Sequence, residues 1–240
     1  MSDVASRSEA LRALRRLCRG TPSLVSATDN PRLSMGIPSL DLLLPQQGPE
    51  RGSLIEWQSS VAGSGAAVLA LQGVRSAVQR KKVWAVVDPA GEFHAAAVSG
   101  WGLSMESLLL IRPSSRNDAL WAVEQCLRCS AIGVTWTQSD QVSNRVVQRW
   151  KIAVEAGRGL GVLFRSAQQA RQASWVDIRW LVQPRPATIS NWRRLKVDLV
   201  SCRGAFSGGS VEMDVNDATG DVRLVSDLAG AASATRAAGA

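Results

Sequence analysis

The segment SSVAGSGAAV, Ser59 to Val68, has the length and glycine content of a phosphate-binding loop. It follows the apolar run LIEW and begins a stretch rich in Ala, Val and Leu that predicts a helix. In a loop of the pattern G-x-x-x-x-G-K followed by Ser or Thr, backbone N–H groups surround the β-phosphate. The lysine reaches the β- and γ-phosphate oxygens, and the hydroxyl holds magnesium. Nucleotide binding is therefore the first candidate chemistry.

The loop lacks the side chains that act on a nucleotide. Aligning the second glycine of the pattern with Gly65 places Ser60 at the first glycine, Ala66 at the lysine and Ala67 at the hydroxyl. Loss of the lysine removes the strongest fixed cation facing a tetra-anionic ligand, so even nucleotide binding is expected to be weak. Gly63 and Gly65 have a simpler use, because glycine permits a tight turn from a strand to a helix.

Short apolar segments alternate with amphipathic segments through the middle of the chain. The predicted strands are Leu54–Gln58, Val83–Asp88, Leu108–Arg112, Ile132–Trp136 and Leu160–Arg165. The predicted helices are Ala66–Gln79, Phe93–Val98, Asn117–Cys129 and Asn144–Ala156. This alternation is typical of a parallel sheet covered by helices on both faces.

The last third of the chain has a different pattern. Trp175–Val182 and Arg193–Val200 alternate apolar with polar residues, and SVEMDV and VRLV flank a turn that contains Gly220. We interpret these segments as half-exposed antiparallel strands. The predicted fold class is therefore α/β, with a core of mostly parallel strands flanked by helices and extended by antiparallel strands at the C-terminal end.

Residues 33–226 are predicted to form the folded domain. Residues 1–20 read as an amphipathic helix with Leu11, Leu14 and Leu17 on one face and arginines on the other, and residues 21–32 read as a linker. Such a helix docks on another subunit or packs back on its own domain, and both remain open. Residues 227–240 are small and of low complexity, which predicts disorder.

Composition narrows the classes of function. The net charge of +8 favours contact with polyanions, nucleic acid first. The chain has neither 18 consecutive apolar residues nor a signal peptide, so we expect a cytoplasmic protein without membrane contact. Cys126 and Cys129 form a C-x-x-C beside a single histidine, His94. Buried thiols are the favoured interpretation, with no metal and no cofactor expected.

Four segments resemble the core of the RecA recombinase family. They are Leu33–Leu44, Arg51–Trp57, Lys81–Phe93 and Arg193–Gly204, and the resemblance runs in order over about Leu33 to Val225. It implies a RecA-like core whose loop after the first strand is the degenerate segment described above.

The resemblance also identifies catalytic positions that have been lost. The magnesium carboxylate at the end of the fourth strand corresponds to Trp136 or, with a shift of one, to Thr135. The glutamate that activates water corresponds to Ala90, with Glu92 two residues late, and the sensor residue corresponds to Arg165. Because catalysis of phosphoryl transfer consists almost entirely of placed charge, we predict that the protein is not an enzyme.

Within this superfamily the sequence resembles the ImuA family. The shared features are the degenerate loop, a short basic amino-terminal helix, a tryptophan at the fourth strand and GVLFR on the fifth. The resemblance implies a non-catalytic accessory protein of SOS-induced translesion DNA synthesis, associated with the nucleoid during DNA damage. Its implied partners are an ImuB-type Y-family-like protein, an error-prone C-family polymerase and RecA, with DNA left open. The alternatives are a SulA-like SOS inhibitor of cell division and an ATP-sensing RecA paralogue without hydrolysis.

Two basic segments are candidates for DNA contact. In the helix Ser143–Arg158, basic residues point away from the apolar face, although a solvated surface is the favoured alternative; they are Arg145, Arg149 and Lys151. The segment Pro184–Arg194 lies where the resemblance places a DNA-facing loop, and it contributes Arg185, Trp192, Arg193 and Arg194. A partner protein fits the second segment equally well. Leu11, Leu14 and Leu17 are the candidate anchors for another subunit.

Overall fold

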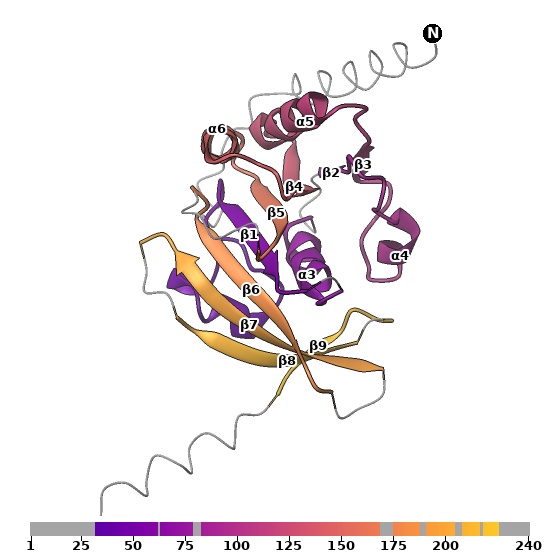
Figure 1. Cartoon of the computed structure of the whole chain (residues 1–240), viewed down its shortest axis with the longest axis vertical. Helices are drawn as coiled ribbons and strands as arrows, with labels where there is room; N and C mark the ends of the chain where they lie inside the picture. Colours follow the sequence, from indigo (N-terminus) through magenta and orange to yellow (C-terminus); the bar gives the residue numbers. More distant parts are fainter. Residues whose placement is uncertain are drawn as a thin grey trace, which may run out of the picture.

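The described part of the chain is built on one mixed sheet of nine strands with helices on both faces (Figure 1). The computed structural model describes residues 32–61, 63–78, 83–168, 175–187, 191–204, 208–216 and 218–225. Predictions for the amino-terminal helix with Leu11, Leu14 and Leu17, for most of the linker and for the tail lie outside these residues. Arg32, assigned to the linker, bridges to Glu50 and belongs to the folded part.

The strands lie in the order β3-β2-β4-β5-β1-β6-β7-β8-β9. Their bounds are β1 Leu54–Ser59, β2 Val83–Val87, β3 Leu108–Ile111, β4 Ile132–Gln138, β5 Leu160–Ser166, β6 Ile178–Arg185, β7 Trp192–Cys202, β8 Ser210–Asn216 and β9 Val222–Leu224. Strands β1 to β6 pair in parallel, and β7 to β9 continue the sheet in antiparallel pairs. The predicted α/β class with a mostly parallel core and an antiparallel C-terminal extension is confirmed.

The helices are α2 Pro38–Asp41, the 3-10 turn η1 Pro45–Gln47, α3 Ala66–Val78, α4 Ala95–Ser99, α5 Arg116–Arg128 and α6 Asn144–Gly157. Two separate hydrophobic cores show that the sheet is covered on both faces. One core contains the buried side chains of α3 and α4, and the other contains those of α5 and α6. Crossover helices on both faces explain why the parallel strands are almost continuously apolar.

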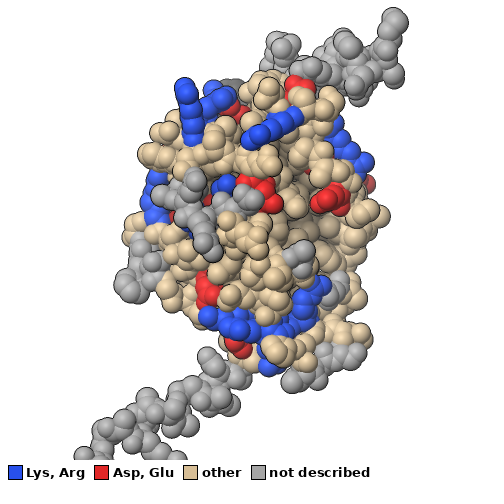
Figure 2. Space-filling model, in the orientation of Figure 1, with Lys and Arg blue, Asp and Glu red and all other residues tan. Residues whose placement is uncertain are grey.

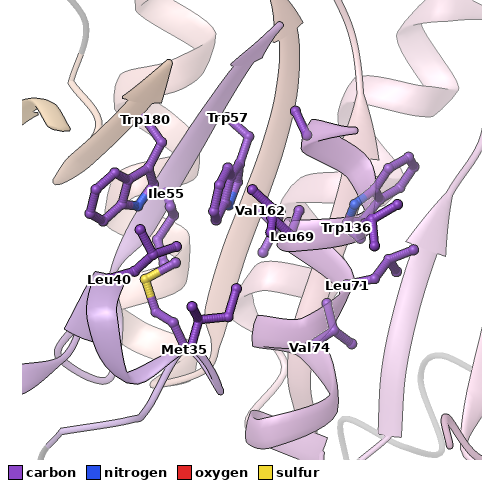
Figure 3. Close-up of a cluster of buried hydrophobic side chains, with 14 of the residues drawn as sticks. Met35, Leu40, Ile55, Trp57, Leu69, Leu71, Val74, Trp136, Val162 and Trp180 are labelled. Carbon is purple, nitrogen blue, oxygen red and sulfur yellow. The ribbon is translucent and has the colours of Figure 1, made fainter. Parts of the chain in front are cut away.

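Tryptophans fill the core on the α3 face. Trp57 of β1 stacks on Trp180 of β6, with ring centroids 5.9 Å apart, and the two indoles share this core with Leu69 and Val74 of α3 (Figure 3). Stacked aromatic pairs contribute about 0.5–1.5 kcal/mol beyond their buried area. The high tryptophan content therefore serves the core first. Cys126 and Cys129 are buried thiols in the opposite core, as predicted.

One predicted strand, β6, pairs in parallel with one of its neighbours, contrary to the prediction. The segment Trp175–Val182 was expected to form an antiparallel strand, but β6 begins at Ile178 and runs parallel to β1 before pairing antiparallel with β7. Trp180 and Val182 are fully buried because β6 has neighbours on both sides. Alternation of apolar residues indicates a strand but carries no information about the direction of its partner.

No helix among the described residues is long and apolar enough to cross a membrane.

At the opposite end of β1 from the loop, a buried ion pair fixes the start of the strand. Lys151 Nζ lies 2.6 Å from Asp177 Oδ2 and donates to the Gly52 carbonyl, while the Leu54 N–H donates to the same carboxylate. The prediction that Lys151 lies on an exposed basic face is wrong, because the side chain is turned inward to this carboxylate.

Replacing Lys151 by methionine should destabilise the fold by about 2 kcal/mol or more, because the largely buried Asp177 carboxylate loses its closest cation and keeps, among the described residues, only Arg203, at 3.7 Å. The matched control is Arg145→Met on the same helix, where the side chain is exposed and the cost should stay within about 0.5 kcal/mol. Urea unfolding of both variants measures the difference. Equal stability of the two variants would refute a structural role for Lys151.

Candidate functional site

The loop between β1 and α3 lies at the carboxyl end of the central strand β1, between β5 and β6. In open α/β sheets, ligands bind outside the carboxyl ends of the strands. The fold therefore puts the degenerate loop where a nucleotide would be expected.

The loop closes on itself through its own polar groups. Gly63 and Gly65 have φ of 71° and 83°, the left-handed region that favours glycine. The Ser59 and Ser64 hydroxyls are hydrogen-bonded at 2.7 Å, Ser59 also donates to the Val61 carbonyl, and the Ser64 N–H donates to that carbonyl at 3.3 Å. Ser64 is buried. These polar groups are satisfied without a ligand.

Side chains of β7, which follows β6 in the antiparallel part of the sheet, pack against the loop. Arg193 Nη1 donates to the Gly63 carbonyl at 2.5 Å, and Leu195 is completely buried against Gly65. A Cβ added to Gly65 would lie 2.9 Å from Leu195 Cδ1. The protein's own side chains therefore occupy the space beside Gly65.

Ala66 and Ala67 have different surroundings. Ala66 is buried in the core with α3, and Ala67 is partly exposed. Ser60, at the position of the first glycine, donates its N–H to the Val182 carbonyl of β6 at 3.1 Å. The loop is thus anchored to β6 as well as to β7.

The turn after β2 holds a buried carboxylate with a structural role. Asp88 accepts hydrogen bonds from the backbone N–H groups of Glu92 and Phe93, both at 3.0 Å, and lies 3.5 Å from Arg112 Nε. Ala90 and Glu92 are exposed on this turn. The one buried carboxylate of this turn therefore holds the chain in shape.

The fourth strand extends further than predicted. It ends at Gln138, two residues after Trp136, so the expectation that Trp136 or Thr135 ends the strand is wrong. Trp136 is buried between Phe93 and Phe164, with centroid distances of 5.7 and 6.4 Å. The strand end carries an amide where the resemblance implies a carboxylate.

A buried cluster of charged side chains around Glu56 of β1 was not predicted from the sequence. Glu56 is fully buried, with carboxylate oxygens 3.9 Å from Arg165 Nη1 and 3.5 Å from Arg179 Nη2, and it accepts a hydrogen bond from Gln58. Arg165 also donates to the carbonyls of Asp140 and Val142. The signal was present, because charged residues interrupt segments that otherwise read as buried strands. Arg165 therefore ties β5 to β1 and to the chain after β4.

The basic residues of β6 and β7 are largely paired with acids. Arg194 makes two hydrogen bonds to Asp214, at 2.9 and 3.3 Å, and Arg223 donates to the same carboxylate while covering the Trp192 ring at 4.0 Å. Arg185 lies 3.8 Å from Glu212. Figure 2 shows Lys and Arg gathered with acidic groups at the end of the molecule where Figure 1 labels β8 and β9.

The hydrogen bond from Arg194 holds the pKa of Asp214 below its ordinary value. On α6, Arg149 pairs with Glu124, which also accepts from Arg128 at 3.0 Å. Arg145 is exposed and forms no ion pair with another described residue. Arg145 is therefore a candidate for DNA contact whose charge no described acidic side chain neutralises.

The described part of the chain also has cavities away from the loop. One of about 200 Å³ lies where β2, β3 and β4 end, and one of about 290 Å³ lies near Arg32 and Cys202. Burial raises the pKa of the Cys202 thiol. None of the described residues of Ser59–Gly65 lines either cavity.

No model of a known protein family matches the sequence, and no curated protein matches it. The chemistry of this region is therefore argued from its geometry.

Exchanging each loop glycine for alanine separates backbone strain from packing. Gly63→Ala should cost about 1–2 kcal/mol, since φ is positive and no atom lies within 4 Å of the new Cβ. Gly65→Ala should cost about 1–3 kcal/mol more, because the added methyl meets Leu195. Chemical unfolding of both variants measures the difference, and equal costs would show that β7 does not pack tightly on the loop.

The Asp214 ion pairs should make stability depend on acidity. Because the folded-state pKa is lowered, the stabilisation is present above the ordinary value of 3.8 and is lost as pH falls through the folded-state pKa. Asp214→Asn should cost about 2 kcal/mol at pH 7, the scale of a charged hydrogen bond. Unfolding measured from pH 7 to pH 3 should show this difference shrinking. A difference that stays constant over this range would contradict the assignment.

Proposed function

We propose that this protein is a RecA-like domain that keeps the fold, has lost the nucleotide reaction, and acts as a binding scaffold. The observation that carries the proposal is the loop after β1. It lacks the lysine and hydroxyl of a phosphate loop, and the space beside Gly65 is filled by Leu195 while Arg193 contacts Gly63. A charged phosphate would have to displace side chains that already pack there.

The order of the parallel strands supports the RecA-like part of the proposal. The loop-bearing strand β1 lies between β5 and β6, and the chain crosses from α3 to β2 past two intervening strands. The four segments that resemble the recombinase core fall on this framework in the same order. The proposal includes no catalysis, because the described residues of Ser59–Val68 include neither a lysine nor a carboxylate that could bind magnesium.

The biological role follows from the resemblance to the ImuA family. We infer an accessory protein of SOS-induced translesion synthesis in bacteria, acting in the cytoplasm at the nucleoid. It would bring an ImuB-type protein, an error-prone C-family polymerase and RecA together, which raises the local concentration of the polymerase at a lesion. Direct binding of DNA would make a smaller contribution, since Arg185, Arg194 and Arg223 already have acidic partners.

The protein should recover its protein partners independently of DNA. A pull-down of the full chain from DNA-damaged bacterial cells is expected to retain the polymerase partners after nuclease treatment. Recovery of a cell-division protein instead of the polymerase partners would favour the alternative of a SulA-like inhibitor of cell division. Loss of every partner after nuclease treatment would contradict the scaffold role.

For the purified full chain, millimolar ATP with magnesium should leave the melting temperature unchanged. A bound nucleotide would stabilise the fold by about 2.7 kcal/mol at one hundred times its dissociation constant. The double variant Ala66→Lys, Ala67→Thr, checked for folding by circular dichroism, should not hydrolyse ATP. A thermal shift would favour the ATP-sensing alternative, and measurable turnover by the double variant would overturn the proposal.

A further inference from the structure

The cavity of about 200 Å³ lies at the edge of the sheet where β2, β3 and β4 end and α5 begins. Its inner wall is formed by Ala119 and Val123 of α5 and by Trp150 of α6, and its rim carries Ser114, Arg116 and Ser139. These residues come from two loops and two helices, so the overall fold creates the cavity.

The topology explains why space opens at this place. Strands β2 and β4 are adjacent, but the chain leaves β2 towards α4, which packs in the core on the α3 face. The chain leaves β4 towards α6, which packs in the opposite core. Connections that part to opposite faces leave a crevice at the carboxyl ends of the two strands, the usual position of ligands in α/β sheets.

The interior of the cavity is suited to an apolar group. The Trp150 indole N–H already donates to the Leu120 carbonyl at 3.3 Å, and the Thr137 hydroxyl donates to the Val87 carbonyl at 3.0 Å. The indole nitrogen of Trp150 and the hydroxyl of Thr137, which also lines the cavity, are therefore already hydrogen-bonded within the protein. What the inner wall offers a ligand is the indole ring together with the methyl groups of Ala119 and Val123.

The rim is suited to a negative charge. Arg116 is exposed at the first residue of α5 and donates to the Gln141 carbonyl, which keeps its guanidinium beside the opening. The helix start, capped by Ser115, adds the positive end of a 13-residue dipole, which Asp118 in the first turn partly offsets, so Arg116 is the main source of positive charge at the rim. The hydroxyls of Ser114 and Ser139 supply further hydrogen-bonding groups at the rim.

We propose that this cavity is a docking site for an acidic segment of a partner protein. One branched apolar side chain enters the cavity, and a neighbouring carboxylate lies against Arg116 and the start of α5. The volume suits one side chain and lies below the usual 300–1,000 Å³ of pockets for drug-sized ligands. The net charge of +8 complements an acidic partner. The inference rests on the proposed scaffold function only in taking the ligand to be a protein.

Calorimetry on the full chain with three acetylated pentapeptides tests the site. The first carries a central leucine flanked by two acidic residues on each side, the second replaces leucine by serine, and the third replaces the acids by their amides. The leucine-acidic peptide should bind most tightly, the serine peptide at least tenfold more weakly, and the amide peptide several-fold more weakly. The advantage of the acidic peptide should shrink in high salt.

Two variants and a control locate the binding. Ala119→Leu fills the cavity and should reduce binding at least tenfold, and Arg116→Ala should reduce it several-fold while lessening its dependence on salt. Arg128→Ala, at the other end of α5, should bind like the unchanged protein. Melting temperatures of all three confirm folding, and the exposed position of Arg116 keeps that variant informative if Ala119→Leu fails to fold.

Equal binding of the leucine and serine peptides, unchanged binding by Arg116→Ala, or no binding at millimolar peptide in low salt would each overturn the proposal. So would competition by a short single-stranded DNA with loss of that competition in Arg116→Ala, which would assign the rim to nucleic acid. Peptide binding without recovery of polymerase partners from cells would leave the site standing and refute the scaffold role. Recovery of those partners by Ala119→Leu would place them on another surface.

Discussion

The contact between Leu195 and Gly65 joins the antiparallel end of the sheet to the loop after β1. Leu195 is fully buried there because β6 and β7 bring it over the start of α3. Only glycine allows this approach, since a methyl group would lie 2.9 Å from Leu195 and φ is positive. The same contact joins the end of β1, the start of α3 and β7, and it fills the space beside Gly65.

Buried charges hold β1 at its first residue and at its third residue, Glu56. Asp177 and Lys151 fix its first residue, while Glu56 pairs with Arg165 and Arg179 on the neighbouring strands. Such pairs contribute little net stability compared with apolar residues, but losing one partner is costly, so they specify register more than they add stability. They also show that part of the positive charge lies inside, where it is unavailable to a polyanion.

Local pattern predicted most of the fold and less of the site. Apolar periodicity located α3, α5 and α6 and the five core strands to within a few residues, because these elements bury one face or both. It did not give the direction of β6 or the inward turn of Lys151, since each depends on a partner distant in sequence, β1 in one case and Asp177 in the other. The pairing of Glu56 with Arg165 was missed for the same reason.

The carboxyl edge of the sheet carries both the loop after β1 and the cavity where β2, β3 and β4 end, and β7 packs against the loop. Strand β7 reaches the loop after β1 because a single strand, β6, separates them. The cavity between the ends of β2 and β4 is separated from β6 by β5 and β1, so side chains of β7 do not fill it. Packing by β7 thus fills the space beside Gly65, while the crevice that the topology creates where β2 and β4 end stays open.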